Sequence, residues 1–164
     1  MNLEPEITHR AAEPYVGISS WVTMADVGSV ADRLPEIFGW LGARGIAPAG
    51  PPFFRYHVID MERQLLVEAG VPVVSAIDDA GDIRAGRLPA GRFAVMTHTG
   101  APDTLMAATA ALLEWAEAQG LAWDVAQTDE GEKWGCRVEF YLTDPAAQPD
   151  MTRWQTQLAF RLAD

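Results

Sequence analysis

The chain has 164 residues, 49% of them hydrophobic, so it is long enough for one domain with a sizeable core and too apolar to be disordered. Its net charge of −11 repels a phosphate backbone, which argues against direct nucleic-acid binding and favours cationic partners. No apolar run reaches the roughly 20 residues of a membrane span, and the N-terminal segment has no secretory signal. We therefore expect a cytoplasmic protein that does not contact a membrane.

The first half of the chain has the pattern of a strand, a helix and two more strands. Apolar positions spaced by three and four residues predict the helix, with Asp26 as a plausible N-cap and Gly45 at its end. Pro35 lies inside this pattern and either kinks the helix or starts its main segment. The expected elements are a strand over residues 7–18, bulged near Pro14, a helix over residues 26–44, and strands over residues 53–60 and 64–68.

The second half repeats this order after a turn at residues 89–91. Gly120 ends the predicted helix, and the last strand alternates apolar and polar residues as a half-buried strand does. The expected elements are a strand over residues 92–97, a helix over residues 103–119, a hairpin of residues 123–128 and 133–142 around residues 129–131, and a strand over residues 153–162.

Two such modules predict an α+β fold, in which a duplicated β-α-β-β module forms antiparallel sheet or sheets with two long helices and a central ligand pocket. Residues 78–82 have the composition of a turn that joins the two halves. We expect a single domain over residues 1–164, with pseudo-repeat halves of about 1–80 and 81–164.

The sequence indicates neither a metal nor a cofactor. The single cysteine, Cys136, excludes an internal disulfide and a thiol cluster within one chain. His9, His57 and His98 are scattered without the spacing of metal ligands. The glycines are spaced as in turns and form neither a phosphate loop nor a dinucleotide fingerprint.

Glu139 lies in a predicted strand, where it shares one face with Arg137 and Tyr141. A carboxylate beside aromatic rings suits a planar cation, because the ring faces attract the cation and the carboxylate balances its charge. If apolar surroundings raise its pKa, the same carboxylate suits a general base on water, with Tyr141 or Tyr56 as hydrogen-bond partner. An outward Glu139 paired with Arg137 or with a cross-strand lysine is the third interpretation, and spacing alone leaves all three open.

Other residues are candidates for the same pocket. Glu68 holds the matching place in the first half, and His98, at a strand end, is a ligand, a base or, most commonly for a lone histidine, a structural donor. The six tryptophans are either core residues or walls of a cavity lined with flat rings. The candidate ligand-binding residues are Glu139, Tyr141, Tyr56, Glu68, Trp134, Trp21, Phe54 and His98. If the pocket is catalytic, the catalytic residues are Glu139 and Tyr141.

Five segments, in this order and spacing, carry a resemblance to a known family. They are residues 41–53 followed by Tyr56, then residues 68–73, 88–94, 98–100 and 139–145. Together they resemble the GyrI-like small-molecule-binding family, which includes the effector-binding domains of AraC-type and multidrug-sensing transcription regulators. The resemblance implies a pocket between two halves with a strand glutamate at the position of Glu139. Because the chain begins almost directly at the first strand, we expect a stand-alone member without a DNA-binding domain.

We expect a protein that takes up apolar, planar, cationic small molecules in an aromatic pocket around Glu139. The resemblance leaves two alternatives open. One is a hydrolase that opens strained cyclopropane rings of cytotoxic compounds, with Glu139 activating water. The other is a gyrase-inhibitor-like interaction with a basic protein partner, which the acidic charge suits.

Overall fold

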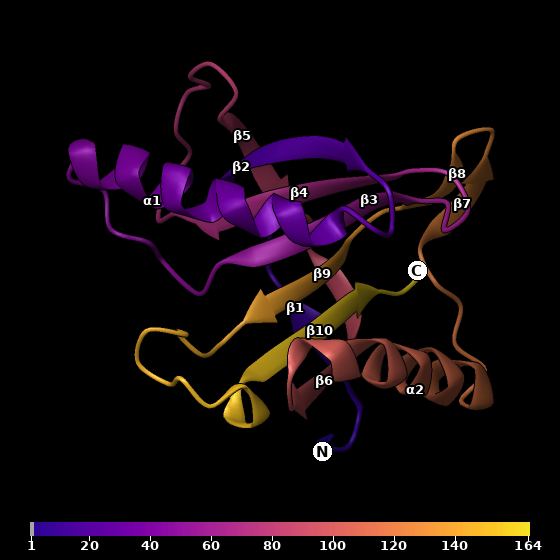
Figure 1. Cartoon of the computed structure of the whole chain (residues 1–164). Coiled ribbons are helices and arrows are strands. Elements are labelled where there is room, and N and C mark those ends of the chain that lie inside the picture. Colours follow the sequence, from indigo (N-terminus) through magenta and orange to yellow (C-terminus); the bar gives the residue numbers. More distant parts are fainter. Residues whose placement is uncertain (1) are drawn as a thin grey trace.

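The computed structural model describes residues 2–164 as one curled antiparallel sheet of ten strands with two helices (Figure 1). The strands are β1 (Glu6–Arg10), β2 (Glu13–Val22), β3 (Phe53–Ile59), β4 (Leu65–Pro72), β5 (Arg84–Leu88), β6 (Gly91–Thr99), β7 (Val125–Thr128), β8 (Gly131–Trp134), β9 (Arg137–Tyr141) and β10 (Gln155–Arg161). The helices are α1 (Leu34–Ala43) and α2 (Leu105–Ala118), and 3₁₀ turns span Val27–Arg33, Pro102–Thr104 and Met151–Arg153. The predicted α+β class is confirmed.

The strand order repeats between the two parts of the sheet. In one part β2, α1, β3 and β4 give the order β2-β4-β3, and in the other β6, α2, β9 and β10 give the order β6-β10-β9. Strands β3 and β9 join the two parts, and Phe54 lies opposite Glu139 across that junction. The duplicated module predicted from the sequence is therefore present, and Glu139 lies near the middle of the sheet. The division of the chain into halves at about residue 80 stays a prediction.

The strand predicted over residues 7–18 is two strands. β1 pairs with β6 at one end of the sheet, and β2 pairs with β4 and β5 at the other. The chain passes between the two parts at Ala11 and Ala12, and Pro14 then enters β2 without a backbone N–H to donate. A proline at this place fits a bulge within one strand as well as a break between two strands, so the sequence pattern alone did not reveal the break.

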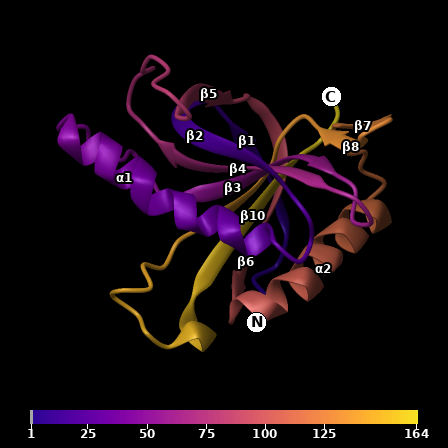
Figure 2. The same cartoon turned by 45° about the horizontal axis from the view of Figure 1, so that its top comes forward.

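Each helix ends where a glycine adopts a left-handed conformation. Gly45 has a φ of 67° after α1, and Gly120 has a φ of 73° after α2. Pro35 lies in the first turn of α1 and follows a 3₁₀ segment, so it starts the main helical segment, one of its two predicted roles. The two helices lie on the same face of the sheet, α1 over β2 and β4 and α2 over β6 (Figure 2).

The predicted hairpin also differs from the structure. Its second strand stops at Trp134, and the chain turns at Gly135 and Cys136 before β9 begins. A side chain at Gly135 would collide with the carboxylate of Asp124, so the turn depends on glycine. After this break β9 leaves β7 and β8 and pairs with β3 and β10. The last strand covers residues 155–161, and its predicted inward residues Thr156, Leu158 and Phe160 are buried.

Two apolar clusters occupy the two faces of the sheet. The larger lies under the helices and includes Ile37 of α1 and Leu112 of α2. The smaller lies on the opposite face around Tyr15, Phe53 and Phe140. Within residues 2–164, none of the helices has the length and apolar character that crossing a membrane requires.

Candidate functional site

The centre of the candidate site is the carboxylate of Glu139, which is only 8% exposed. Its neighbours Val138 and Phe140 belong to the smaller cluster, so Glu139 points to the face that carries the helices. Its Oε1 accepts hydrogen bonds from the hydroxyls of Tyr56, at 3.0 Å, and Tyr141, at 2.9 Å. Its Oε2 receives no hydrogen bond from any residue within 2–164. The predicted outward Glu139 paired with Arg137 is therefore not what the structure shows.

Burial is the main cause of the shifted pKa values of Glu139, Tyr56 and Tyr141. Loss of hydration raises the pKa of Glu139, and the tyrosine hydroxyls and the charge of Arg137 only partly oppose this rise. Burial, reinforced by the charge of Glu139, also raises the pKa values of Tyr56 and Tyr141 well above that of a free tyrosine. Both tyrosines therefore stay protonated and serve as donors, and Glu139 is the group that titrates.

A cavity of about 890 Å³ lies beside this group, between the two parts of the fold. Two predicted ligand-binding residues, Tyr141 and Phe54, line it. Most of the other wall residues, which come from helices and loops, were not predicted from the sequence. They include Leu34, Pro35, Phe38, Pro51, Pro52, Pro102, Leu105, Leu142, Asp144, Pro145 and Trp154. The available signal was the proline-rich segment before Phe53, which supplies Pro51 and Pro52 to the wall.

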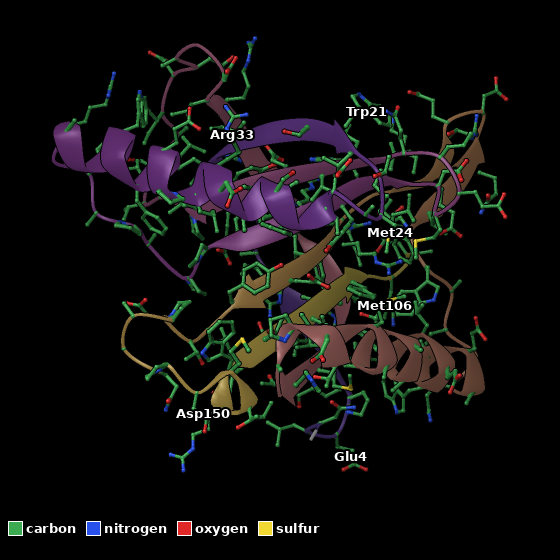
Figure 3. The ribbon with its side chains drawn as sticks, in the orientation of Figure 1. Glu4, Trp21, Met24, Arg33, Met106 and Asp150 are labelled. Atoms are coloured by element: carbon green, nitrogen blue, oxygen red, sulfur yellow. The ribbon has the colours of Figure 1, made fainter. Side chains whose placement is uncertain are left out.

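The cavity is acidic and mainly apolar. Among its lining residues within 2–164, Asp144 alone carries a charge, and none is a lysine, arginine or histidine. Tyr141 both lines the cavity and donates a hydrogen bond from its hydroxyl to Glu139, so it connects the cavity wall to the buried carboxylate. The aromatic rings of Phe38, Phe54 and Trp154 complete the wall. Side chains fill much of the remaining space between the ribbons (Figure 3).

Glu68 lies on the opposite face of the sheet from Glu139. It is 5% exposed, and its Oε1 accepts a hydrogen bond from the Tyr15 hydroxyl at 2.5 Å. The same oxygen lies 2.8 Å from His57 Nε2. Burial and the charge of Glu68 raise the pKa of Tyr15, which therefore stays a donor. The structure thus separates Glu68 from the cavity by the thickness of the sheet.

His98 is buried in a structural network. Its Nδ1 contacts the side chain of Asn2, and its Nε2 lies 2.6 Å from the hydroxyl of Thr104, just before α2. Burial lowers the pKa of His98, which favours the neutral ring. His98 therefore ties the end of β6 to the start of α2, close to the cavity residues Gly100 and Pro102 without itself lining the cavity.

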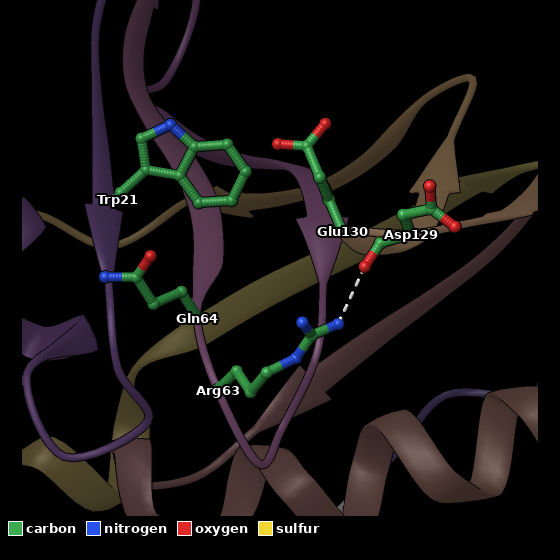
Figure 4. A pocket seen from close by; sticks show the side chains of 5 residues that line it. All are labelled: Trp21, Arg63, Gln64, Asp129 and Glu130. Atoms are coloured by element: carbon green, nitrogen blue, oxygen red, sulfur yellow. Dashed lines mark hydrogen bonds between the residues drawn. The ribbon is translucent and has the colours of Figure 1, made fainter.

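The two predicted tryptophans lie outside the cavity. Trp134 packs with Trp123 and Phe160 in the larger cluster. Trp21 is 45% exposed at the end of β2, where it lines a separate surface pocket of about 330 Å³ with Arg63 and Glu130 (Figure 4). The structure therefore brings together Glu139, Tyr141, Tyr56 and Phe54, and leaves the other four candidates elsewhere.

The structure also bears on a metal site and on the reactivity of Cys136. Within residues 2–164, no three His, Cys, Asp or Glu side chains come together as metal ligands would. Cys136 is buried, and burial raises the pKa of its thiol to about 11, so the thiolate is disfavoured at neutral pH.

A duplicated fold with an apolar cavity between its parts and a buried glutamate at its edge defines a small-molecule-binding domain. The chain belongs to the GyrI-like small-molecule-binding domain family, which matches residues 3–163. No curated protein matches the chain in sequence.

Solved structures share the fold at low sequence identity. The C-terminal domain of EcmrR is 19% identical, with a TM-score of 0.78 and 98% coverage of both chains. The chain spans 57% of EcmrR in its complex with DNA. SAV2435 bound to tetraphenylphosphonium is 10% identical, with a TM-score of 0.66 and coverage of 98% of this chain and 94% of that one. A hydrolase from Listeria innocua is 13% identical, with a TM-score of 0.61 and coverage of 98% and 92%.

Proposed function

We propose that the protein binds apolar organic cations in the cavity between the two parts of its fold. The observation that carries this proposal is the buried carboxylate of Glu139, which accepts hydrogen bonds only from tyrosines and forms no ion pair within residues 2–164. Removing a carboxylate from water is costly, and a cation nearby offsets this cost more strongly in apolar surroundings than in water. A cationic ligand beside Tyr141 supplies that missing charge.

The walls of the cavity support the same ligand class. Aromatic rings at Phe38, Phe54, Tyr141 and Trp154 offer faces that attract cations and flat apolar surfaces. Asp144 adds a second negative charge, and no lining residue repels a cation. Tyr56 is not among the lining residues, and its hydrogen bond holds the carboxylate of Glu139 in place. The predicted binding roles of Glu68, Trp134, Trp21 and His98 are not included in this site.

Two probes of the same shape and opposite charge test the proposal. We expect tetraphenylphosphonium to bind at least about tenfold more tightly than tetraphenylborate, because the charge difference acts on Glu139 and Asp144 through apolar surroundings. Isothermal titration calorimetry at low and moderate salt measures both affinities. A planar cation, ethidium, tests whether flat ligands are preferred. Equal affinities for the phosphonium and the borate would contradict the proposal.

A second candidate function is hydrolysis of strained cyclopropane rings, and one observation favours it. Glu139 has a raised pKa, and its Oε2 has no hydrogen-bond partner among residues 2–164, which suits an acceptor for the proton of an attacking water. We expect such an activity to open the ring by adding water and to disappear in the Glu139→Gln variant. Mass spectrometry detects the product by the added mass of one water. Turnover that survives in Glu139→Gln would exclude this role.

A further inference from the structure

Arg137 is a partly buried cation that does not line the cavity. It lies two residues before Glu139 on β9, so both side chains point to the same face of the sheet. It is partly buried, and within residues 2–164 its side chain forms no hydrogen bond and no ion pair with Glu139 or with any other residue, although its backbone pairs with β10. The guanidinium carries five N–H donors, so its position depends on contacts of another kind.

Aromatic rings hold this guanidinium in place. Its carbon lies 4.8 Å from the ring centre of Trp134 and 4.5 Å from that of Phe160. Both rings are almost fully buried, and Trp123 packs against both of them. Two buried ring faces at these distances attract the cation electrostatically and restrict its movement. The two rings therefore hold Arg137 in place without an ion pair to a carboxylate.

The charge of Arg137 nevertheless acts on Glu139. Burial raises the pKa of Glu139, whereas the hydrogen bonds from Tyr141 and Tyr56 and the charge of Arg137 lower it. These are the titratable and charged groups that act on the carboxylate from β3 and β9, and Glu132 acts on Arg137. Among them Arg137 is the one cation.

We propose that Arg137 is a positioning residue, an internal cation that favours the ionised form of Glu139 before a ligand binds, while its attachment to two rings leaves the carboxylate available to that ligand. This inference rests on the proposed function. An ion pair between the two residues would also keep Glu139 charged, but it would compete with the cationic ligand. Attachment to rings avoids this competition, because the charge acts at a distance.

The pH dependence of binding distinguishes this role from a structural one. Tetraphenylphosphonium does not titrate, so its affinity for the unaltered protein should rise with pH as Glu139 ionises. In Arg137→Met we expect the midpoint to move upward by about one pH unit, which means about tenfold weaker binding below the midpoint. Well above the midpoint the variant should bind as tightly as the unaltered protein or more tightly, because a repelling cation is gone. Arg137→Lys retains the charge and should retain the original midpoint.

Three results would overturn the inference. One is an unchanged midpoint in Arg137→Met, and another is a uniform loss of affinity at every pH, as a merely structural role would give. The third is an unchanged midpoint in Arg137→Gln, the second neutral variant, which replaces Arg137→Met if that protein does not fold. Glu139→Gln separates the two proposals. If binding by Glu139→Gln no longer depends on pH while Arg137→Met leaves the midpoint unchanged, only this inference fails. Full cation binding by Glu139→Gln at every pH contradicts the proposed function itself.

Discussion

Replacing Glu139 with glutamine is expected to weaken tetraphenylphosphonium binding by about 10- to 100-fold, because the buried negative charge beside the cavity is lost. Glutamine has nearly the same shape, and its amide oxygen can still accept hydrogen bonds from Tyr56 and Tyr141. The variant should therefore keep the fold and show a smaller preference for the phosphonium over the borate, with Asp144 as the remaining negative charge. Calorimetric titration of both probes measures this change, and circular dichroism checks the fold.

The matched control for this variant is Glu114→Gln, which makes the same chemical change at an exposed position on α2. It alters the net charge by the same amount, so it corrects for any general attraction of cations to an acidic protein. We expect Glu114→Gln to change the affinity less than about twofold at moderate salt. If both variants lose the same affinity, the attraction comes from the overall charge and Glu139 has no special role.

Replacing Phe53 with alanine is expected to lower the free energy of unfolding by about 3–5 kcal/mol, a typical loss for a fully buried aromatic ring. Phe53 is 0% exposed at the junction of the two parts of the sheet. Its ring packs edge-on against Tyr15 at 5.0 Å and Phe140 at 5.5 Å. It also fills the space above Gly70, where a Cβ atom would approach the ring to 2.5 Å. Urea unfolding measures the loss.

Phe38→Ala provides the comparison for Phe53→Ala. Phe38 is 38% exposed and lines the ligand cavity. The same truncation there should cost less than about 1 kcal/mol of unfolding free energy, because little apolar surface leaves the interior. It should instead weaken ligand binding. Equal destabilisation by the two variants would mean that the junction around Phe53 is not the tightly packed part of the sheet.

Parts of the site could be predicted because they follow from local periodicity. Glu139 and Tyr141 are two residues apart in a strand, so their side chains share a face and the hydroxyl can reach the carboxylate. The inward residues of β10 follow from the same alternation. The ends of both helices follow from the glycines at 45 and 120, since a left-handed conformation favours glycine.

The strand face of Glu68 could not be predicted from periodicity. Glu68 and Glu139 both lie in apolar strands, and the pattern gives no reason to separate them. The face to which a strand residue points depends on the pairing register, and a shift of one residue reverses it. The register of β4 with β2 places Glu68 opposite Ser19, on the face with Tyr15, and the register of β9 with β3 places Glu139 opposite Phe54, under the helices.

By itself, the sequence determined the α+β class, the repeated order of strands and helices, and the shared strand face of Glu139 and Tyr141, because these depend on spacing between near neighbours. Only the tertiary structure decided that β1 and β2 are separate strands, that Trp21 is exposed, and that Arg137 rests on Trp134 and Phe160. The cavity belongs to the second group, because its walls come from segments far apart in the chain, and their approach depends on the packing of both helices on one curled sheet.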